Sequence, residues 1–298
     1  MPLPLTQAIV EQWVSITRGQ FNVRDIWAEI GIDSPEGKNH LRKILDRLET
    51  KEIITHIEKG YGNYRCIDNA ATKIEWENAD PDNTVPLLFP FGEHEFVKIF
   101  PKSIIIVAGS KQAGKTAYLY NFIKLNMPKY AIDLFNSETG PEQMKERFVS
   151  LGITASPSFN VYERYDNYAD VISSDPDRIS VVDYLDLNSE VYLVGAEIDA
   201  IFRKIKGVAV IGLQKPPPSV IFTKTGAKKI IERDLAYGGG FTAKRAILYI
   251  TMGSNKLKLL YVKSPKQKKV NPQNMTWNFT FNDEGHFDNV SRYFGEEL

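Results

Sequence analysis

The N-terminal part of the chain has apolar residues at helical spacing, followed by a stretch with the pattern of strands. One apolar helical face runs through residues 6–17, and Asn22, a residue type that caps helix N-termini, precedes a second short helical pattern. Ser-Pro-Glu at 34–36 is a helix start, and the pattern after it predicts a third helix that ends at about Glu49. Segments rich in β-forming residues on both sides of residues 59–63 predict a hairpin.

Three helices followed by a hairpin is the order of a winged helix-turn-helix domain, which we predict for residues 1–68. In such domains the last helix can enter the major groove of DNA. Here that helix carries Lys38, Arg42 and Lys43, which can reach phosphates and base edges. However, the domain contains nine basic and ten acidic residues, and many winged helices bind protein. DNA contact and protein docking are therefore both open.

A different pattern begins after the polar, acidic segment 69–84, which we interpret as an interdomain linker. Over residues 85–298, short apolar runs alternate with helical patterns, which is typical of an α/β domain. The final segments alternate like antiparallel strands, and we expect their aromatic residues Trp277, Phe279 and Phe281 to pack in the core. The clearest apolar runs are residues 103–108, 130–135, 179–182 and 208–213.

The first apolar run of this domain leads into a glycine-rich loop and then into a helical pattern. Glycines allow the backbone to wrap a phosphate, so that amide N–H groups and the helix N-terminus face the anion. Lys115 can reach the β- and γ-phosphates, and the Thr116 hydroxyl can bind Mg²⁺. A strand before the loop and a helix after it favour a nucleoside triphosphate site over a structural glycine turn. The segment consists of Gly109, Ser110, Lys111, Gln112, Ala113, Gly114, Lys115, Thr116 and Ala117.

Three other predicted strands end next to a polar residue that could act on a bound nucleotide, because ligands bind where parallel strands end. Glu138 could orient or deprotonate an attacking water, or it could cap the helix that follows. Asp183 could hold Mg²⁺, directly or through water, or it could belong to a turn. Gln214 could sense the γ-phosphate, although polar residues at strand ends are common.

Composition excludes several other classes of protein. The 298 residues include 37 Lys and Arg and 37 Asp and Glu, which excludes an intrinsically disordered chain and a uniformly basic nucleic-acid coat. A single cysteine, Cys66, excludes a disulfide framework and a thiolate metal cluster, and the four histidines are scattered. No apolar run approaches the ~18 residues that span a bilayer, and the N-terminal sequence lacks signal-peptide features. We expect a reducing, cytoplasmic compartment and no membrane contact.

Four of these segments, in this order, resemble the RecA/DnaB family of P-loop ATPases, and DnaB-type replicative helicases most closely. They are GSKQAGKT, FNSETGPEQMKERF, ISVVDYLDL and VIGLQKP, and the similarity covers about two-thirds of the chain, from about Val85 onward. The resemblance implies a twisted, mainly parallel sheet flanked by helices. It implies that Glu138 is the catalytic base, that Asp183 lies on the magnesium strand and that Gln214 is the sensor. It also implies a homo-oligomer, a hexameric ring or a filament, with ATP at subunit interfaces.

The sequence also departs from that family. A winged helix takes the place of the helical N-terminal domain, and the trans-acting Lys-x-Arg near the C-terminal strand is not preserved. Lys263 and Lys266 lie in that neighbourhood. A lysine there could complement γ-phosphate charge from a neighbouring subunit, although without the bidentate fork of arginine, or it could be a plain surface lysine.

The basic residues are concentrated in one segment. Residues 203–270 contain sixteen Lys and Arg but only two acidic residues, so this segment carries a charge of +14. In RecA-like folds the loop after the sensor Gln contacts DNA, so we expect phosphate contacts from Lys215, Lys224, Lys228 and Lys229. Tyr237 and Phe241 could stack on single-stranded bases or could be core residues.

Two functions from different classes follow. The first is an ATP- and Mg²⁺-dependent motor, a helicase or translocase that assembles on single-stranded DNA. The second is an ATP-switched loader, recombination mediator or transposition regulator that binds DNA without unwinding it. A transcription regulator that works through the winged helix alone would leave the four ordered motifs unexplained.

Overall fold

The computed structural model describes residues 5–17, 19–57, 61–185, 193–222, 228–253, 255–282 and 286–294, with backbone only for 221–222 and 228–231. The chain divides into two compact units, Met1–Ala79 and Asp80–Leu298, and this division falls within the segment 69–84. Among the described residues no helix has the length and apolarity needed to cross a bilayer.

The first unit contains three helices and a small antiparallel sheet of order β1-β3-β2. The side chain of Asn22 accepts a hydrogen bond from the Arg24 backbone N–H, and Ser34 caps the third helix through the Gly37 N–H, as the sequence predicts. Strand β1 was not predicted, because three residues are too short to show an alternation. The elements are α1 (Gln7–Thr17), β1 (Gln20–Asn22), α2 (Val23–Ile30), α3 (Pro35–Thr50), β2 (Ile54–His56) and β3 (Asn63–Cys66), and the 3₁₀ helix η1 (Trp76–Asn78) follows them.

The second unit is an α/β domain around a nine-stranded, mainly parallel sheet of order β14-β13-β12-β11-β4-β8-β7-β5-β6. Strands β11, β4, β8, β7, β5 and β6 are parallel to one another, and β12, β13 and β14 extend the sheet with antiparallel pairs. The elements are η2 (Glu93–Glu95), β4 (Ser103–Gly109), α4 (Lys115–Asn126), β5 (Ala131–Asn136), α5 (Pro141–Leu151), β6 (Phe159–Glu163), α6 (Tyr168–Val171), β7 (Arg178–Asp183), α7 (Leu193–Lys204), β8 (Val208–Gln214), β9 (Ser219–Phe222), β10 (Lys228–Ile231), α8 (Gly240–Ala243), β11 (Ala246–Gly253), β12 (Lys256–Val262), β13 (Thr276–Phe281) and β14 (Phe287–Tyr293).

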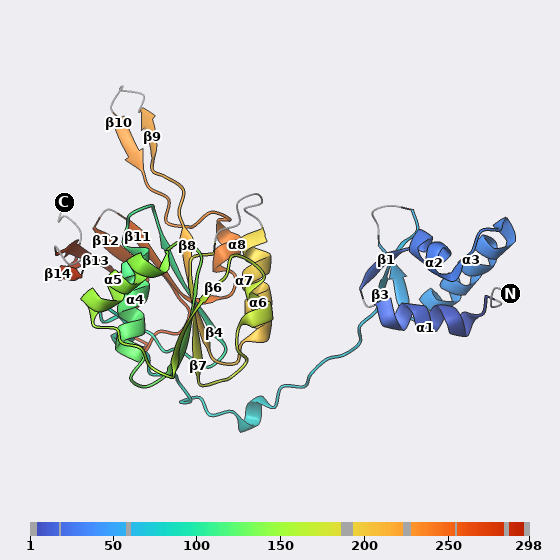
Figure 1. Ribbon diagram of the computed structural model, residues 1–298, viewed down its shortest axis with the longest axis horizontal. Coiled ribbons are helices and arrows are strands. Elements are labelled where there is room, and N and C mark those ends of the chain that lie inside the picture. The colour runs from blue at the N-terminus through green and yellow to red at the C-terminus, as the bar shows by residue number, and fades with distance from the viewer. Residues whose placement is uncertain are drawn as a thin grey trace. The chain divides into compact units, whose positions relative to one another are not determined.

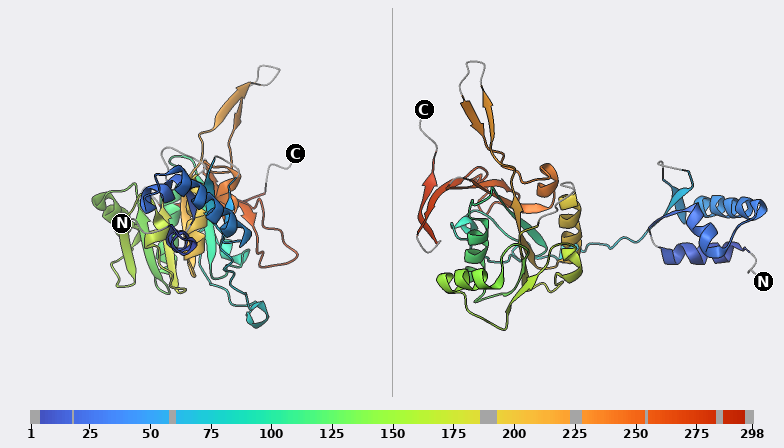
Figure 2. Two further views of the ribbon diagram at one scale, coloured as in Figure 1. Left: turned by 90° about the vertical axis from the view of Figure 1, so that its right-hand side faces the viewer. Right: turned by 45° about the horizontal axis from the view of Figure 1, so that its top comes forward.

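Helices cover both faces of this sheet, with α4 and α5 on one side and α6, α7 and α8 on the other (Figures 1 and 2). Every residue of β4 is buried, and its side chains alternate between the two cores. Ile105 and Val107 pack with Leu119 of α4, whereas Ile104 and Ile106 pack with Ile198 of α7. A strand that is apolar on both faces therefore forms the centre of the domain.

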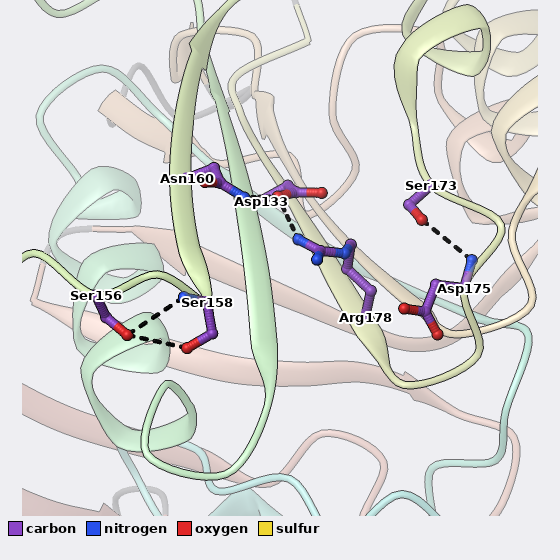
Figure 3. Close-up of polar contacts among 7 residues, drawn as sticks. All are labelled: Asp133, Ser156, Ser158, Asn160, Ser173, Asp175 and Arg178. Carbon is purple, nitrogen blue, oxygen red and sulfur yellow. Dashed lines mark hydrogen bonds and ion pairs between the residues drawn. The ribbon is translucent and has the colours of Figure 1, made fainter.

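A buried polar cluster connects the strands near the β6 edge (Figure 3). Asp133 of β5 accepts a hydrogen bond of 2.7 Å from Arg178 Nη1 at the start of β7, and a second of 2.9 Å from Asn160 Nδ2 on β6. Both bonds reach the same oxygen, Oδ1, so a guanidinium and an amide offset the cost of burying this carboxyl group. This cluster holds three neighbouring strands in register.

A second buried carboxyl joins the segment before the sheet to helix α4. Glu93 of η2 is fully buried; it accepts hydrogen bonds from the Tyr118 hydroxyl (2.8 Å) and from the Phe91 N–H (2.9 Å). Burial raises the pKa of Glu93 from about 4.5 to about 7, although these hydrogen bonds act in the opposite direction.

The Glu93→Gln variant should respond to pH differently from the wild type. Between about pH 4.5 and 7 the folded wild type binds more protons at this position than the unfolded chain, so its stability falls as the pH rises. Gln does not titrate, so the variant gains relative stability by about 1.4 kcal/mol for each pH unit in this window. Urea unfolding at pH 5, 6, 7 and 8 measures the difference. The exposed neighbour variant Glu95→Gln is the control, and parallel curves for Glu93→Gln and wild type would contradict the assignment.

Candidate functional site

A cavity of about 680 Å³ lies at the edge of the sheet where the parallel strands end. The register aligns Gly109 of β4 with Gln214 of β8, and Asn136 of β5 with Asp183 of β7. Four strand ends therefore meet at one edge, which is where ligands bind in open α/β sheets. The cavity is lined by Lys111, Gln112, Gly114, Lys115, Thr116, Ala117, Tyr120, Glu138, Thr139, Gln143, Arg147, Leu151, Tyr184, Gln214 and Phe281.

The glycine-rich loop has the shape that its sequence predicts. Gly114 has a φ of 90° at the N-cap of α4, a conformation that favours glycine. A Cβ at Gly109 would lie 2.7 Å from Lys115 Cγ, so only glycine lets the lysine fold back over the loop. Lys115 Nζ donates a hydrogen bond to the Ser110 carbonyl at 3.2 Å. Burial lowers the pKa of Lys115, while the charges of Glu138 and Asp183 act in the opposite direction.

Asp183, at the end of β7, lies beside Thr116 at the start of α4. Asp183 Oδ1 accepts a hydrogen bond of 3.2 Å from the Thr116 hydroxyl, whereas Oδ2 is buried without a partner in the described part of the chain. Burial raises the pKa of Asp183 to about 6. An unpaired carboxylate oxygen beside a hydroxyl fits Mg²⁺, which prefers oxygen. No three His, Cys, Asp or Glu side chains converge among the described residues, so Mg²⁺ here would also need ligand oxygens.

The loop that carries Glu138 is held by hydrogen bonds on both sides. Asn136 Oδ1 accepts from the Thr139 N–H (3.1 Å), and its Nδ2 donates to the Thr139 carbonyl (2.7 Å). Ser137 donates through its hydroxyl to the Tyr184 carbonyl (2.8 Å) and through its N–H to the Asp183 carbonyl (3.0 Å). These bonds fix the backbone around Glu138, whose exposed side chain lines the cavity.

Helix α5 contributes two cavity residues that the sequence analysis missed. Gln143 and Arg147 are one helical turn apart, so both side chains reach the same cavity. The charge of Arg147 lowers the pKa of Asp183, although burial outweighs this effect. The sequence signal for both is their i, i+4 spacing directly after the Glu138 loop.

Phe281 is a third cavity residue that the sequence analysis missed, because we expected it in the core. Its ring packs edge-on against Phe279, with centroids 5.4 Å apart, and a Cβ on Gly114 would lie 2.5 Å from Phe281 Cζ. Phe279 and Trp277 are buried as expected. Phe281 thus places an aromatic wall directly beside the glycine-rich loop.

Gln214 lies in the cavity wall, but Lys215 does not lie on an accessible surface. The Tyr237 N–H donates to the Gln214 carbonyl at 3.0 Å. Lys215 is only 4% exposed, and its Nζ donates to the Thr251 hydroxyl on β11 at 3.0 Å. The Lys215 N–H donates to the Gly109 carbonyl, so the pairing of β8 with β4 continues through this residue. The side chain therefore lies in the interior of the domain. The expected phosphate contact by Lys215 is therefore wrong.

The other residues that we expected to contact DNA belong to different elements of the two units. Lys228 and Lys229 belong to β10, which pairs with β9 in an antiparallel hairpin that projects from the sheet (Figure 1), and Lys224 lies outside the described residues. Tyr237 and Phe241, close to the hairpin in sequence, are 41% and 64% exposed rather than core residues. In the first unit Arg42 and Lys43 are exposed on α3, whereas Lys38 Nζ lies 4.6 Å from the centre of the Trp27 ring.

Lys263 and Lys266 are not among the residues that line the cavity of their own chain. Lys263 follows β12, whose end pairs with the beginning of β11 at the opposite edge of the sheet. Lys263 Nζ donates to the Lys244 carbonyl, and Lys266 Nζ donates to the His94 carbonyl. The +14 segment is thus divided between two edges of the domain.

No known protein family model matches this sequence, and a search of curated proteins also found no match.

Asn136 should control the stability of the Glu138 loop. Asn136→Ala leaves a buried N–H and a buried carbonyl of Thr139 without partners, at a cost of about 1–3 kcal/mol for each group. Urea unfolding measures this loss. Asn121→Ala is the matched control, because it removes one hydrogen bond to the Ala117 carbonyl on helix α4, away from the loop. Equal stabilities of the two variants would contradict the role of Asn136.

Proposed function

We propose that this chain is an ATP-dependent, DNA-binding motor of the RecA/DnaB type, a helicase or translocase that assembles on single-stranded DNA. The observation that carries the proposal is the convergence of Lys115, Thr116, Glu138 and Gln214 on one cavity, with Asp183 bonded to Thr116. These residues come from four strand ends that are far apart in sequence. Each of the four strand ends belongs to one of the four segments that resemble the family.

The architecture supports the same proposal. A mainly parallel sheet between two layers of helices, with antiparallel strands at one end, is compatible with a RecA-like ATPase domain. For the first unit we propose a winged helix, supported by three helices, a small antiparallel sheet and the exposed basic residues of α3.

In the proposed reaction, the protein positions ATP and stabilises charge, with little covalent chemistry. The backbone N–H groups of the loop and the N-terminus of α4 bind the phosphates, and Lys115 neutralises charge on the β- and γ-phosphates. Mg²⁺, held by Thr116 and Asp183, would supply further charge neutralisation. Glu138 accepts a proton from the attacking water. Gln214 contacts the γ-phosphate and reports its presence to the segment beyond.

Arg147 gives this chain a cation for the γ-phosphate within its own cavity. The guanidinium makes no ion pair in the described part of the chain, so its charge is available to a ligand. An arginine in cis reduces the need for the trans-acting arginine that the sequence lacks. Lys263, at the opposite edge of the sheet, and Lys266 do not line the cavity, so they would act only on the nucleotide of a neighbouring subunit.

The route from nucleotide to DNA begins at Gln214. Its carbonyl accepts the Tyr237 N–H, so the sensor is bonded to the far end of the segment that contains the β9–β10 hairpin. Lys215, the next residue, is buried, and this burial lowers the pKa of its side chain. The charges of Asp234 and Glu232 act in the opposite direction with a smaller effect. A shift of Gln214 on hydrolysis would therefore move the base of the hairpin.

The loader or mediator function is the second candidate, and the lysines in place of a trans-acting arginine favour it. A strand-displacement assay with a forked duplex distinguishes a helicase from a loader, because a loader binds DNA but does not unwind it.

ATP turnover should depend on both DNA and the cavity residues. We expect single-stranded DNA to stimulate ATPase activity, and Lys115→Ala and Glu138→Gln to reduce it by at least about 100-fold, since each removes charge stabilisation or general base catalysis. Phosphate release with and without oligo-dT measures this. Lys124→Ala, an exposed lysine on α4, is the control. ATPase activity that is the same with and without single-stranded DNA would contradict the proposed motor function.

The hairpin lysines should set the salt dependence of DNA binding. For single strands, each phosphate that the protein neutralises adds about 0.7 to the slope of log binding constant against log salt concentration. The double variant Lys228→Ala, Lys229→Ala should therefore have a slope that is shallower by about 1.4. Fluorescence anisotropy with oligo-dT at several salt concentrations measures the slope. The control is Lys124→Ala with Lys145→Ala on the exposed faces of α4 and α5. An unchanged slope for the hairpin variant would rule out this contact.

A further inference from the structure

Among the described residues, one that lines the cavity and one bonded to its lining each carry a buried polar atom without a hydrogen-bond partner. In the part of the chain that the structure describes, the buried side-chain atoms without a hydrogen-bond partner are Trp27 Nε1, Tyr120 Oη and Asp183 Oδ2. Asp183 has the metal role proposed above, whereas no motif of the sequence involves Tyr120. An unsatisfied buried group of this kind needs an explanation, and a catalytic role is one of the few available.

Tyr120 lies on α4, one helical turn after Thr116, and is fully buried. Its ring packs edge-on against Phe148 of α5, with ring centroids 5.0 Å apart. Its pKa is raised well above the ordinary value, mainly by burial and also by the charge of Asp183; Arg147 and the Thr139 side chain act in the opposite direction. The hydroxyl therefore remains protonated at neutral pH and can serve as a donor.

The hydroxyl is not needed for packing. A buried hydroxyl without a partner costs about 1–3 kcal/mol, and phenylalanine would keep the contact with Phe148 without this cost. Tyr118, two residues earlier on the same helix, shows the contrast, because its hydroxyl donates to Glu93 at 2.8 Å. One helix therefore carries a buried tyrosine whose hydroxyl is satisfied and another whose hydroxyl is not.

The exposed carboxylate of Glu138 lines the same cavity. The Glu138 carboxylate makes no hydrogen bond to the described part of the chain, although its backbone is fixed by Asn136 and Ser137. The side chain of Thr139, the residue after Glu138, acts to lower the pKa of Tyr120, so the tyrosine reaches the loop that carries Glu138. A general base must be aimed at its water to be effective, and a donor hydrogen bond is the usual means.

We propose that Tyr120 is a positioning residue, whose hydroxyl donates a hydrogen bond to the Glu138 carboxylate, directly or through the attacking water, when nucleotide is bound. This inference rests on the proposed ATPase function. It adds a residue outside the four motifs, and it explains why a hydroxyl is kept at a position where it lowers the stability of the free protein.

The test compares Tyr120→Phe with Tyr118→Phe in the full chain, using steady-state ATPase kinetics and urea unfolding. Tyr120→Phe should lower kcat by about 10- to 100-fold, the range for loss of an orienting partner, with KM for ATP within about twofold of wild type. Its stability should equal or exceed that of the wild type. Tyr118→Phe should lower stability, because Glu93 loses a donor, and should leave kcat unchanged.

A double-mutant cycle tests the link to Glu138. In a Glu138→Gln background, Tyr120→Phe should cause no further loss of kcat, because the two residues act as a unit. An equal loss in both backgrounds, or a rise in KM that matches the loss of kcat/KM, would overturn the positioning role. So would an unchanged kcat in Tyr120→Phe.

The same data separate this inference from the proposed function. If the wild type hydrolyses ATP, Lys115→Ala abolishes this and Tyr120→Phe retains full kcat, only the inference fails. If the wild type hydrolyses no ATP under any of these conditions, the proposed function fails and the inference fails with it.

Discussion

The parallel pairing of β4 with β8, and of β5 with β7, is the constraint on which the site depends. These pairs bring Gly109 level with Gln214 and Asn136 level with Asp183, so four loops start from one edge of the sheet. A displacement of one residue in either pair would turn the side chains of a strand to the opposite face. The buried apolar residues on both faces of β4 oppose such a slip, because each core would receive the wrong side chains.

Several polar groups in the second unit are buried, and they differ in how well they are satisfied. Asp133 and Glu93 have hydrogen-bond donors around them and hold strands and helices together. Asp183 and Tyr120, by contrast, keep one atom each without a partner in the described part of the chain. Satisfied groups of this kind stabilise a fold, whereas unsatisfied groups at a cavity lower the stability of the free protein and are available to a ligand. Asp183 and Tyr120 therefore differ from Asp133 and Glu93 in what their polar atoms contact in the free protein.

The distribution of charge also depends on the fold. The +14 segment is continuous in the sequence, but β8, β11 and β12 carry parts of it to opposite edges of the sheet. Lys206, Lys244 and Lys263 adjoin strand ends at the edge opposite to the cavity, whereas Lys228 and Lys229 lie in the projecting hairpin. Lys215 is inside the domain. A charge count along the chain therefore identified a basic segment, but not one basic surface.

The sequence by itself determined those features that depend on neighbours along the chain. The caps at Asn22 and Ser34, the glycine-rich loop and the apolar strands are of this kind, since backbone conformation and burial periodicity are local properties. Only the tertiary structure decided which distant residues meet. It brought Arg147, Phe281 and Tyr120 to the cavity, buried Lys215 and sent Lys263 to the opposite edge. The physical reason is that these contacts depend on the order and direction of the strands in the sheet, which no local pattern records.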